Sequence, residues 1–385
     1  MFDHLWQSRY RDIFIAGPVI VVFVVLLCLS TTPVFTGDYG EFILAGGIVA
    51  PFVILALLAY TGETIRPVRY IAYLWLLGIL LSIFAINFVL ILAPVDLASP
   101  DPDALTKQLD SLPVATVGTA LLASFGAGLI SLIGFSRSFR VILARRLPIN
   151  PDSPVHTAGL VCALALIIMP LVPLIMTGNA PLLNADLQNM LGIGHEIQGS
   201  SVKLDTFTLI WTIIGSFLLV GLWVRRDIRS TLERLGLVRP TARQVLIGVA
   251  SGLLLVGIFW LFDDAIALLF AANGIPTTDD TLVTNLFMVS FTPLAAVVAS
   301  ITAGLGEELS IRGVIQPRFG ILIAALVFAS MHAYQYAWDG LLSVFLVGLC
   351  FGILRNYTNT STSAISHGVY DLTLFAIIMA GITTL

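Results

Sequence analysis

Charged residues are scarce in this sequence: they make up 11% of its 385 residues, whereas hydrophobic residues make up 58%. Soluble proteins contain about 25% charged residues, so the composition excludes an ordinary soluble domain. The net charge of −4 is dispersed and no basic tract is present, which excludes a typical nucleic-acid-binding protein and predicts no nucleic-acid partner. The composition is typical of a protein most of which lies in membrane lipid.

Cysteine is also scarce. Cys28, Cys162 and Cys350 all lie in apolar runs, and they share no CxxC or Cys/His spacing. This pattern excludes a disulfide framework and a cysteine metal site. We interpret the three cysteines as small core hydrophobic residues.

Long apolar runs are abundant. A helix needs about 20 apolar residues to cross a bilayer, and because the runs are continuous and do not alternate, they do not indicate strands. We therefore predict an all-α, polytopic transmembrane helical bundle with about eleven spans. The predicted spans lie near residues 13–32, 41–61, 70–94, 113–135, 157–177, 206–224, 243–263, 284–310, 320–335, 338–354 and 361–384.

Arginines predict the orientation of these spans. They occur before the first span and in every second loop, for example at 137–146 and 225–243. Cytoplasmic loops carry the excess of Lys and Arg, so we expect the N-terminus in the cytoplasm and the C-terminus outside. The compact loops favour an integral protein of a prokaryotic plasma membrane.

The loop 225–243 is the best internal boundary. Residues 1–224 form a predicted six-span N-terminal membrane region that contains no buried acid–base cluster and has no assigned role. Residues 225–385 contain all the candidate chemistry.

The informative ionisable residues lie in three apolar segments of this second region. Glu307, Glu308 and Arg312 end one run, and residues four apart share a helix face. Arg312 is therefore expected to neutralise Glu308, which leaves Glu307, turned about 100° away, free to act. The distance along the helix supports this: if the helix begins at Pro293, Glu307 lies about 21 Å from its outer end, within the membrane. A start near Thr284 would place Glu307 at the cytoplasmic edge instead.

The same spacing recurs in the other two segments, at Phe328 and His332 and at His367 and Asp371. Ionisable groups at membrane depth cost roughly 2.5–3.5 kcal/mol each, so they indicate function by default. Three helices could thus deliver a Glu, a His and a His–Asp pair to one cavity.

Two chemistries suit this set. Glu307 with His332 could deprotonate a water molecule for attack on a carbonyl, while His367 with Asp371 stabilises the oxyanion or orients that water. Alternatively, Glu307, His332 and His367 could bind Zn²⁺, which takes His and Glu ligands and leaves a position open for water. Both lead to hydrolysis of an amide in the bilayer. The rival interpretations are a proton-coupled transporter and a non-catalytic scaffold or immunity protein that retains the motifs.

The three motifs, Glu307-Glu308-x-x-x-Arg312, Phe328-x-x-x-His332 and His367-x-x-x-Asp371, resemble in order, spacing and setting those of the CPBP intramembrane proteases. That family, also called the Abi family, includes the CAAX prenyl endopeptidases and the bacteriocin-processing and immunity proteins. The resemblance covers about residues 225–385. It implies an intramembrane endopeptidase that acts on a membrane-borne or lipid-modified, CAAX-like peptide or protein, in contact with membrane lipid.

The resemblance also implies residue roles. Glu307 would be the water-activating base and His332 its partner, with Glu308, Arg312 and Phe328 in supporting roles. His367 and the residue at position 371 would stabilise the oxyanion. Asp371 stands where CAAX endopeptidases usually have Asn, and an aspartate donates no hydrogen bond unless it is protonated. This difference favours an orienting role for His367. The family is usually described as metal-dependent, although a metal-free glutamate mechanism is also argued, so zinc stays open.

Overall fold

The computed structural model describes residues 11–32, 35–91, 114–184, 201–279, 281–283 and 292–382. Within these ranges the chain contains helices and no strand, apart from an isolated bridge between Leu222 and Arg226. The all-α prediction is confirmed. Parts of four predicted spans, residues 92–94, 113, 284–291 and 383–384, lie outside the described residues.

The first region comprises α2 (Arg11–Ser30), α3 (Gly37–Thr64), α4 (Arg66–Ile91), α6 (Val114–Ser131), η1 (Leu132–Phe135), α7 (Arg137–Ala144), α8 (Pro154–Ile168), α9 (Leu171–Thr177), η2 (Pro181–Leu183) and α11 (Ser201–Leu219). The second comprises α12 (Ile228–Leu235), α13 (Ala242–Ala272), α15 (Pro293–Ile301), η3 (Thr302–Glu307), η4 (Leu309–Ile315), α16 (Gln316–Met331), η5 (His332–Tyr334), α17 (Trp338–Tyr357) and α18 (Thr360–Met379).

Ten helical segments of the described chain are long and apolar enough to cross a membrane. The prediction of about eleven differs because residues 293–334 form one continuous segment of 42 residues. At 1.5 Å per residue this segment is about twice as long as a hydrocarbon core of about 30 Å. The helix breaks at Gly320, whose φ of 79° and ψ of 172° are not helical. The segment therefore corresponds to the two predicted spans near 284–310 and 320–335.

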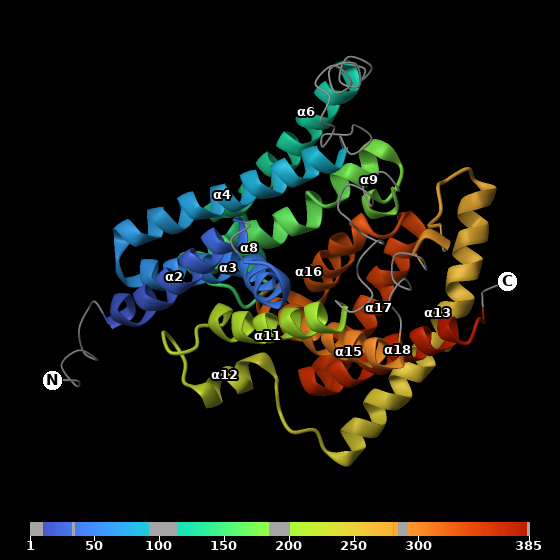
Figure 1. The fold of residues 1–385 in the computed structure, drawn as a ribbon. Helices are drawn as coiled ribbons and strands as arrows, with labels where there is room; N and C mark the ends of the chain where they lie inside the picture. The colour runs from blue at the N-terminus through green and yellow to red at the C-terminus, as the bar shows by residue number, and fades with distance from the viewer. Residues whose placement is uncertain are drawn as a thin grey trace.

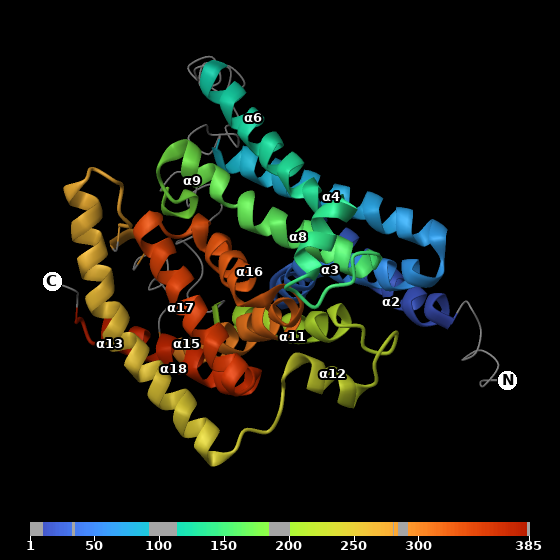
Figure 2. The same ribbon diagram turned by 180° about the vertical axis from the view of Figure 1, so that it is seen from behind.

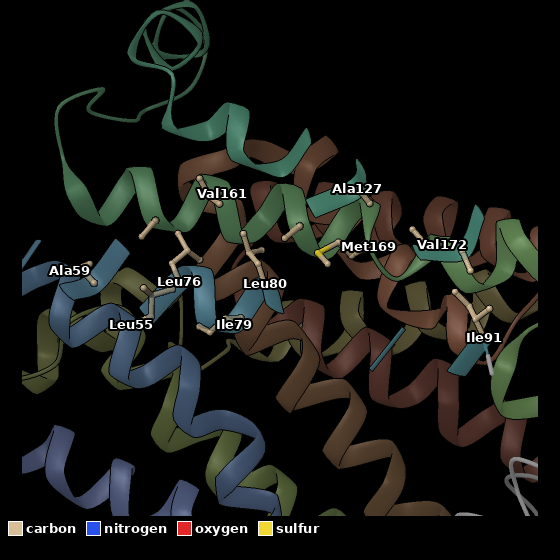
Figure 3. Packing of buried hydrophobic residues seen from close by; sticks show 14 residues of the cluster. Leu55, Ala59, Leu76, Ile79, Leu80, Ile91, Ala127, Val161, Met169 and Val172 are labelled. Carbon is tan, nitrogen blue, oxygen red and sulfur yellow. The ribbon is translucent and has the colours of Figure 1, made fainter. Parts of the chain in front are cut away.

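The N-terminal helices pack around a shared apolar core. Figure 1 shows α4 and α8 running beside α3, with α2 on its other side. The close view in Figure 3 shows side chains from α3, α4 and α8 meeting between these helices, among them Leu55, Leu76 and Val161. Their burial joins α3, α4 and α8 into one packed helical scaffold rather than a row of independent spans.

The second region gathers α13 and α15 to α18 on the other side of the molecule, as both views show (Figures 1 and 2). Small residues let these helices approach closely. A Cβ atom at Gly252 of α13 would lie 2.5 Å from the Ser366 carbonyl oxygen of α18, and one at Gly348 of α17 would lie 2.9 Å from the Phe328 ring of α16. Small residues at such positions are typical of closely packed membrane helices.

The two regions share their packing. Ala163 of α8 belongs to the same buried cluster as Phe328 of α16 and Val347 of α17, and α11 contacts α3 on one side and α15 and η3 on the other. The division of the chain at residue 225 stays a prediction, because this shared core neither requires nor excludes it.

One expected loop is helical. The seventh predicted span ends near residue 263, but α13 continues through Asp263 and Asp264 to Ala272. The apolar residues 265–270 maintain the helix beyond the two carboxylates, and Gly274, with a φ of 67°, follows its end. A pair of aspartates was therefore a misleading helix-end signal.

Candidate active site

Glu307 and Glu308 lie where a membrane helix changes its winding. The helix begins at Pro293, and the Thr292 hydroxyl caps it by accepting a hydrogen bond from the Ala295 amide at 3.2 Å. After Ile301 it continues as two π-helical segments, η3 and η4. Such wide turns within helices occur frequently at functional sites. The start at Pro293 places Glu307 about 21 Å along the helix, at the predicted depth.

A glycine lets α18 approach this segment. A Cβ atom at Gly304 would lie 2.6 Å from the Gly368 amide nitrogen and 2.8 Å from the Ala364 carbonyl oxygen. No real side chain tolerates such distances, so the absence of a side chain at Gly304 is required for this contact. The contact brings His367, which precedes Gly368, beside the two glutamates.

Glu308 is completely buried and is surrounded by donors. Its Oε1 lies 3.2 Å from Arg312 Nη1 and 3.1 Å from His367 Nδ1, while the Ser363 hydroxyl donates to Oε2 at 2.5 Å. The contact with Nη1 is an ion pair without hydrogen-bond alignment. A buried carboxylate with this many donors is a satisfied anchor, because its lone pairs are already engaged.

Arg312 is equally buried. Its Nη2 donates to the Gly348 carbonyl oxygen at 3.0 Å, and its guanidinium carbon lies 4.5 Å from the centroid of the Phe328 ring. The aromatic face provides a cation–π contact to a cation that has lost its water. Arg312 thereby joins the π-helical segment to α16 and α17.

His367 lies between three carboxylates. Its Nδ1 faces Glu308, whereas its Nε2 is 3.4 Å from Asp371 Oδ2 and 3.9 Å from Glu307 Oε2. The ring stacks on Phe351 with centroids 4.6 Å apart. A carboxylate of Glu308 held by Arg312 can only accept, so Nδ1 carries a hydrogen. A hydrogen on Nε2 would be donated to Asp371, because without it the Nε2 lone pair would face the lone pairs of the Asp371 carboxylate.

Glu307 differs from its neighbour in exposure. Its side chain is 39% exposed, while that of Glu308 is not exposed at all. Among the described residues the ion-pair partner of Glu307 is His367, whose Nε2 lies 3.9 Å from Oε2, a distance longer than a hydrogen bond. Adjacent residues thus have separate properties: the Glu308 carboxylate is saturated and fixed, and the Glu307 carboxylate is partly exposed.

His332 lies at the end of α16, where the helix gives way to the short turn η5. Its Nδ1 is 2.8 Å from the Phe328 carbonyl oxygen, which can only accept, so Nδ1 bears the hydrogen. In the neutral ring the lone pair is then on Nε2. The Phe328 ring lies edge-on to both histidines, with centroids 4.8 Å from His332 and 5.9 Å from His367.

The structure places the predicted residues in one region but changes their pairing. The expected Glu308–Arg312 and His367–Asp371 neighbours are present. Within the described chain, no hydrogen bond or ion pair joins Glu307 to His332. The catalytic roles themselves stay predictions.

Two members of this cluster were not predicted. Ser363 binds the buried glutamate, and Phe351 supports the imidazole. Ser363 could have been found, because residues 363, 367 and 371 are each four apart and share one face of α18. Phe351 carries no such signal, since an aromatic residue in an apolar run is indistinguishable from the core around it.

The predicted zinc ligands were Glu307, His332 and His367. Among the residues that the structure describes, no group of three or more His, Cys, Asp or Glu side chains is arranged to hold a metal ion. His367 already directs both ring nitrogens toward carboxylates. The described geometry therefore does not fit this ligand set, and zinc stays an untested prediction.

Comparison with known proteins identifies the segment that carries this cluster. No curated protein and no solved structure matches the chain. The family described as type II CAAX prenyl endopeptidase Rce1-like matches residues 289–373, which include all three motifs. With the ten apolar helices of the described chain, this match indicates an integral membrane protein in which residues 289–373 are similar to the Rce1-like type II CAAX prenyl endopeptidases, consistent with the CPBP resemblance of the three motifs.

Proposed function

We propose that the chain is an intramembrane endopeptidase that uses glutamate-activated water to hydrolyse a peptide bond of a membrane-associated or lipid-modified, CAAX-like peptide. The observation that carries the proposal is the convergence of Glu307, His367 and Asp371 within membrane-spanning helices of a protease-family domain. Ionisable side chains are costly at this depth and mark function.

Glu307 is the base in this mechanism. Its carboxylate is partly exposed, and its ion-pair partner among the described residues, His367, lies 3.9 Å away, beyond hydrogen-bond distance, while Glu308 is saturated by Arg312, His367 and Ser363. A base must have a free lone pair within reach of the water molecule that it deprotonates. Glu308 instead fixes His367 through Nδ1, which orients Nε2 toward Glu307 and Asp371.

The reaction balances without a further reactant. Glu307 takes a proton from water as the water oxygen attacks the carbonyl carbon of the peptide bond. The tetrahedral oxyanion is stabilised by a hydrogen-bond donor, for which a protonated Nε2 of His367 is the candidate. Collapse of this intermediate breaks the C–N bond, and Glu307 returns its proton to the leaving amine. His332 supports Glu307 when the substrate and water are bound.

The substrate is expected to reach the site from the membrane. Glu307 and Asp371 lie in helices that are apolar enough to span the bilayer, so a peptide that is anchored in lipid reaches them more readily than one in solution. The arginine distribution predicts that the Glu307 segment opens toward the cytoplasm, with the N-terminus cytoplasmic and the C-terminus outside.

Glu307→Gln tests the proposal. It keeps the size of the side chain and removes the base, so we expect cleavage of a lipidated reporter peptide in liposomes to fall by about 10²- to 10⁴-fold. Thermal unfolding should be unchanged, because Glu307 is not part of the buried ion pair. Glu233→Gln, which alters an exposed pair on α12, is the matched control and should cleave normally.

The alternatives give different results in the same assay. A transporter would lose proton-coupled flux in the Glu307→Gln variant without any cleavage by the wild type, and a scaffold would lose neither. Cleavage that a chelator abolishes and zinc restores, with zinc found in the purified protein, would support the metal route. Cleavage at wild-type rate by Glu307→Gln would exclude Glu307 as the base.

A further inference from the structure

Asn87, in the N-terminal region, is bonded to the segment that carries His332. It lies on α4 and is completely buried. The Tyr334 hydroxyl donates to Asn87 Oδ1 at 3.0 Å, and Asn87 Nδ2 donates to the Met169 carbonyl oxygen at 2.6 Å. The side chain thus connects three elements that are distant in sequence: α4, the junction between α8 and α9, and η5.

The sequence explains why the Met169 carbonyl needs this donor. In a regular helix it would accept from the amide four residues later, but that residue is Pro173, which has no N–H. The Val172 amide donates to the same oxygen at 3.1 Å, and Asn87 provides the second hydrogen bond. A buried carbonyl has capacity for both. Asn87 is therefore fixed in orientation before it meets Tyr334.

The partner, Tyr334, lies two residues after His332 in the same turn. The residue between them, Ala333, is completely buried and packs in one cluster with Leu174 of α9. Residues 332–334 are thus held from the N-terminal region by one apolar contact and one hydrogen bond. In this turn the His332 Nδ1–H donates to the Phe328 carbonyl oxygen, and this hydrogen bond sets the direction of Nε2.

We propose that Asn87 is a positioning residue for His332, acting through Tyr334, and that the N-terminal helices thereby complete the active site of the Rce1-like domain. The inference rests on the proposed function for the role of His332. The positioning itself depends only on the three linked groups. Without the hydrogen bond at Asn87 Oδ1, the N-terminal region holds η5 by apolar packing alone, and the His332 imidazole gains freedom to move.

The experiment uses the full chain in nanodiscs with ¹⁵N-labelled histidine. Asn87→Leu removes both hydrogen bonds, and Tyr334→Phe removes one hydroxyl and leaves the ring in place. Ser131→Ala is the matched control, because it removes another buried hydrogen bond of the N-terminal region, to Ala127, far from η5 in the chain. The readouts are the ring nitrogen signals of His332, assigned with His332→Gln, and kcat and KM for reporter cleavage.

We expect both test variants to shift the His332 signals and to leave those of His367 in place. We also expect kcat to fall by roughly 10- to 100-fold with little change in KM, because misplacement of a reacting group by about 1 Å has effects of this size. The control should alter neither readout. Unchanged His332 signals in a folded Tyr334→Phe variant would overturn the proposal. Shifted signals in a protein whose wild type cleaves nothing would support the positioning and overturn the proposed function.

Discussion

Two places in the molecule bury an arginine against a carboxylate, and they differ in depth. At the helix ends, Arg225 Nη1 lies 2.8 Å from Asp12 Oδ2, with side chains 22% and 5% exposed. Within the span that contains the π-helical segments, Arg312 pairs with Glu308 at 3.2 Å, with side chains 1% and 0% exposed. The same two charge types therefore occur in a partly hydrated setting and in a dry one.

Their other partners show what each group does. Arg225 also donates to the Tyr60 carbonyl oxygen at 2.7 Å and to Glu63, so it ties the ends of α2 and α3 to the turn after α11. Burial alone would lower the pKa of Arg225, but its hydrogen bond and attraction to Asp12 outweigh burial, and the pKa is raised. This group joins chain ends and needs no further chemistry to explain it.

The deep pair extends toward reactive groups instead. Glu308 continues to His367, whose other nitrogen faces Asp371 and Glu307. A charge without water needs a complete set of partners, and here the last member of the set, Glu307, is partly exposed. Complete burial of the ion pair within a span, combined with a partly exposed carboxylate at the end of the network, distinguishes a candidate active site from a structural ion pair.

Arg312→Met, at the deep pair, should have the largest effect on stability and on cleavage. The variant leaves Glu308 buried without its cation, which costs about 3–5 kcal/mol in comparable pairs. We expect a large fall in the midpoint of thermal unfolding in nanodiscs, together with loss of cleavage. Arg318→Met is the matched control, since Arg318 is partly exposed and bonds only the Pro148 carbonyl, at 3.3 Å.

The double variant Glu308→Leu with Arg312→Met separates stability from function. It replaces both charges by apolar groups of similar size, so it should recover much of the stability that Arg312→Met loses. Cleavage should stay absent, because His367 has lost the carboxylate that fixes Nδ1. Recovery of both properties would mean that the deep pair serves only the fold.

Substitutions of Asp371 test the reactive end of the network, where its carboxylate accepts from His367. Asp371→Asn keeps an acceptor for His367 Nε2–H, so we expect cleavage to fall by less than about tenfold. Asp371→Leu removes the acceptor and should reduce cleavage by roughly 10- to 100-fold, which corresponds to a charged hydrogen bond of about 1.5–3 kcal/mol. Reporter cleavage by both variants, normalised to folded protein, is the measurement. Equal rates for the two would remove Asp371 from the mechanism.

The sequence predicted the features that depend only on the spacing of residues along one helix. The apolar runs predicted the all-α bundle, and the four-residue spacing predicted the neighbours of Glu308 and His367. Of the two starts that the sequence allowed for the helix that carries Glu307, Pro293 and Thr284, the structure has Pro293. These features are local, because periodicity and caps determine them without knowledge of the rest of the fold.

Contacts between segments could not be obtained in this way. The sequence paired Glu307 with His332, whereas the structure places His367 nearer to Glu307, because Gly304 admits α18 so closely. The wide π-helical turns and the break at Gly320 also alter directions that a regular helix would give. The link between Asn87 and Tyr334 spans 247 residues, and only the need of Asn87 for a hydrogen-bond partner could be predicted.

Arg225→Met is the counterpart of Arg312→Met at the shallow pair and should have the smallest effect. The same atoms are removed, but Asp12 keeps Arg11, whose Nη2 lies 3.5 Å from Oδ1, and the Thr64 hydroxyl, which donates to Oδ2 at 3.2 Å. Asp12 also lies in the first turn of α2, where the helix dipole favours a negative charge. We expect a loss of about 1–2 kcal/mol in the free energy of unfolding and cleavage within about twofold of wild type. If this variant lost as much stability as Arg312→Met, burial depth would not distinguish the two ion pairs. The burial of the Glu308–Arg312 pair would then no longer indicate a role in chemistry.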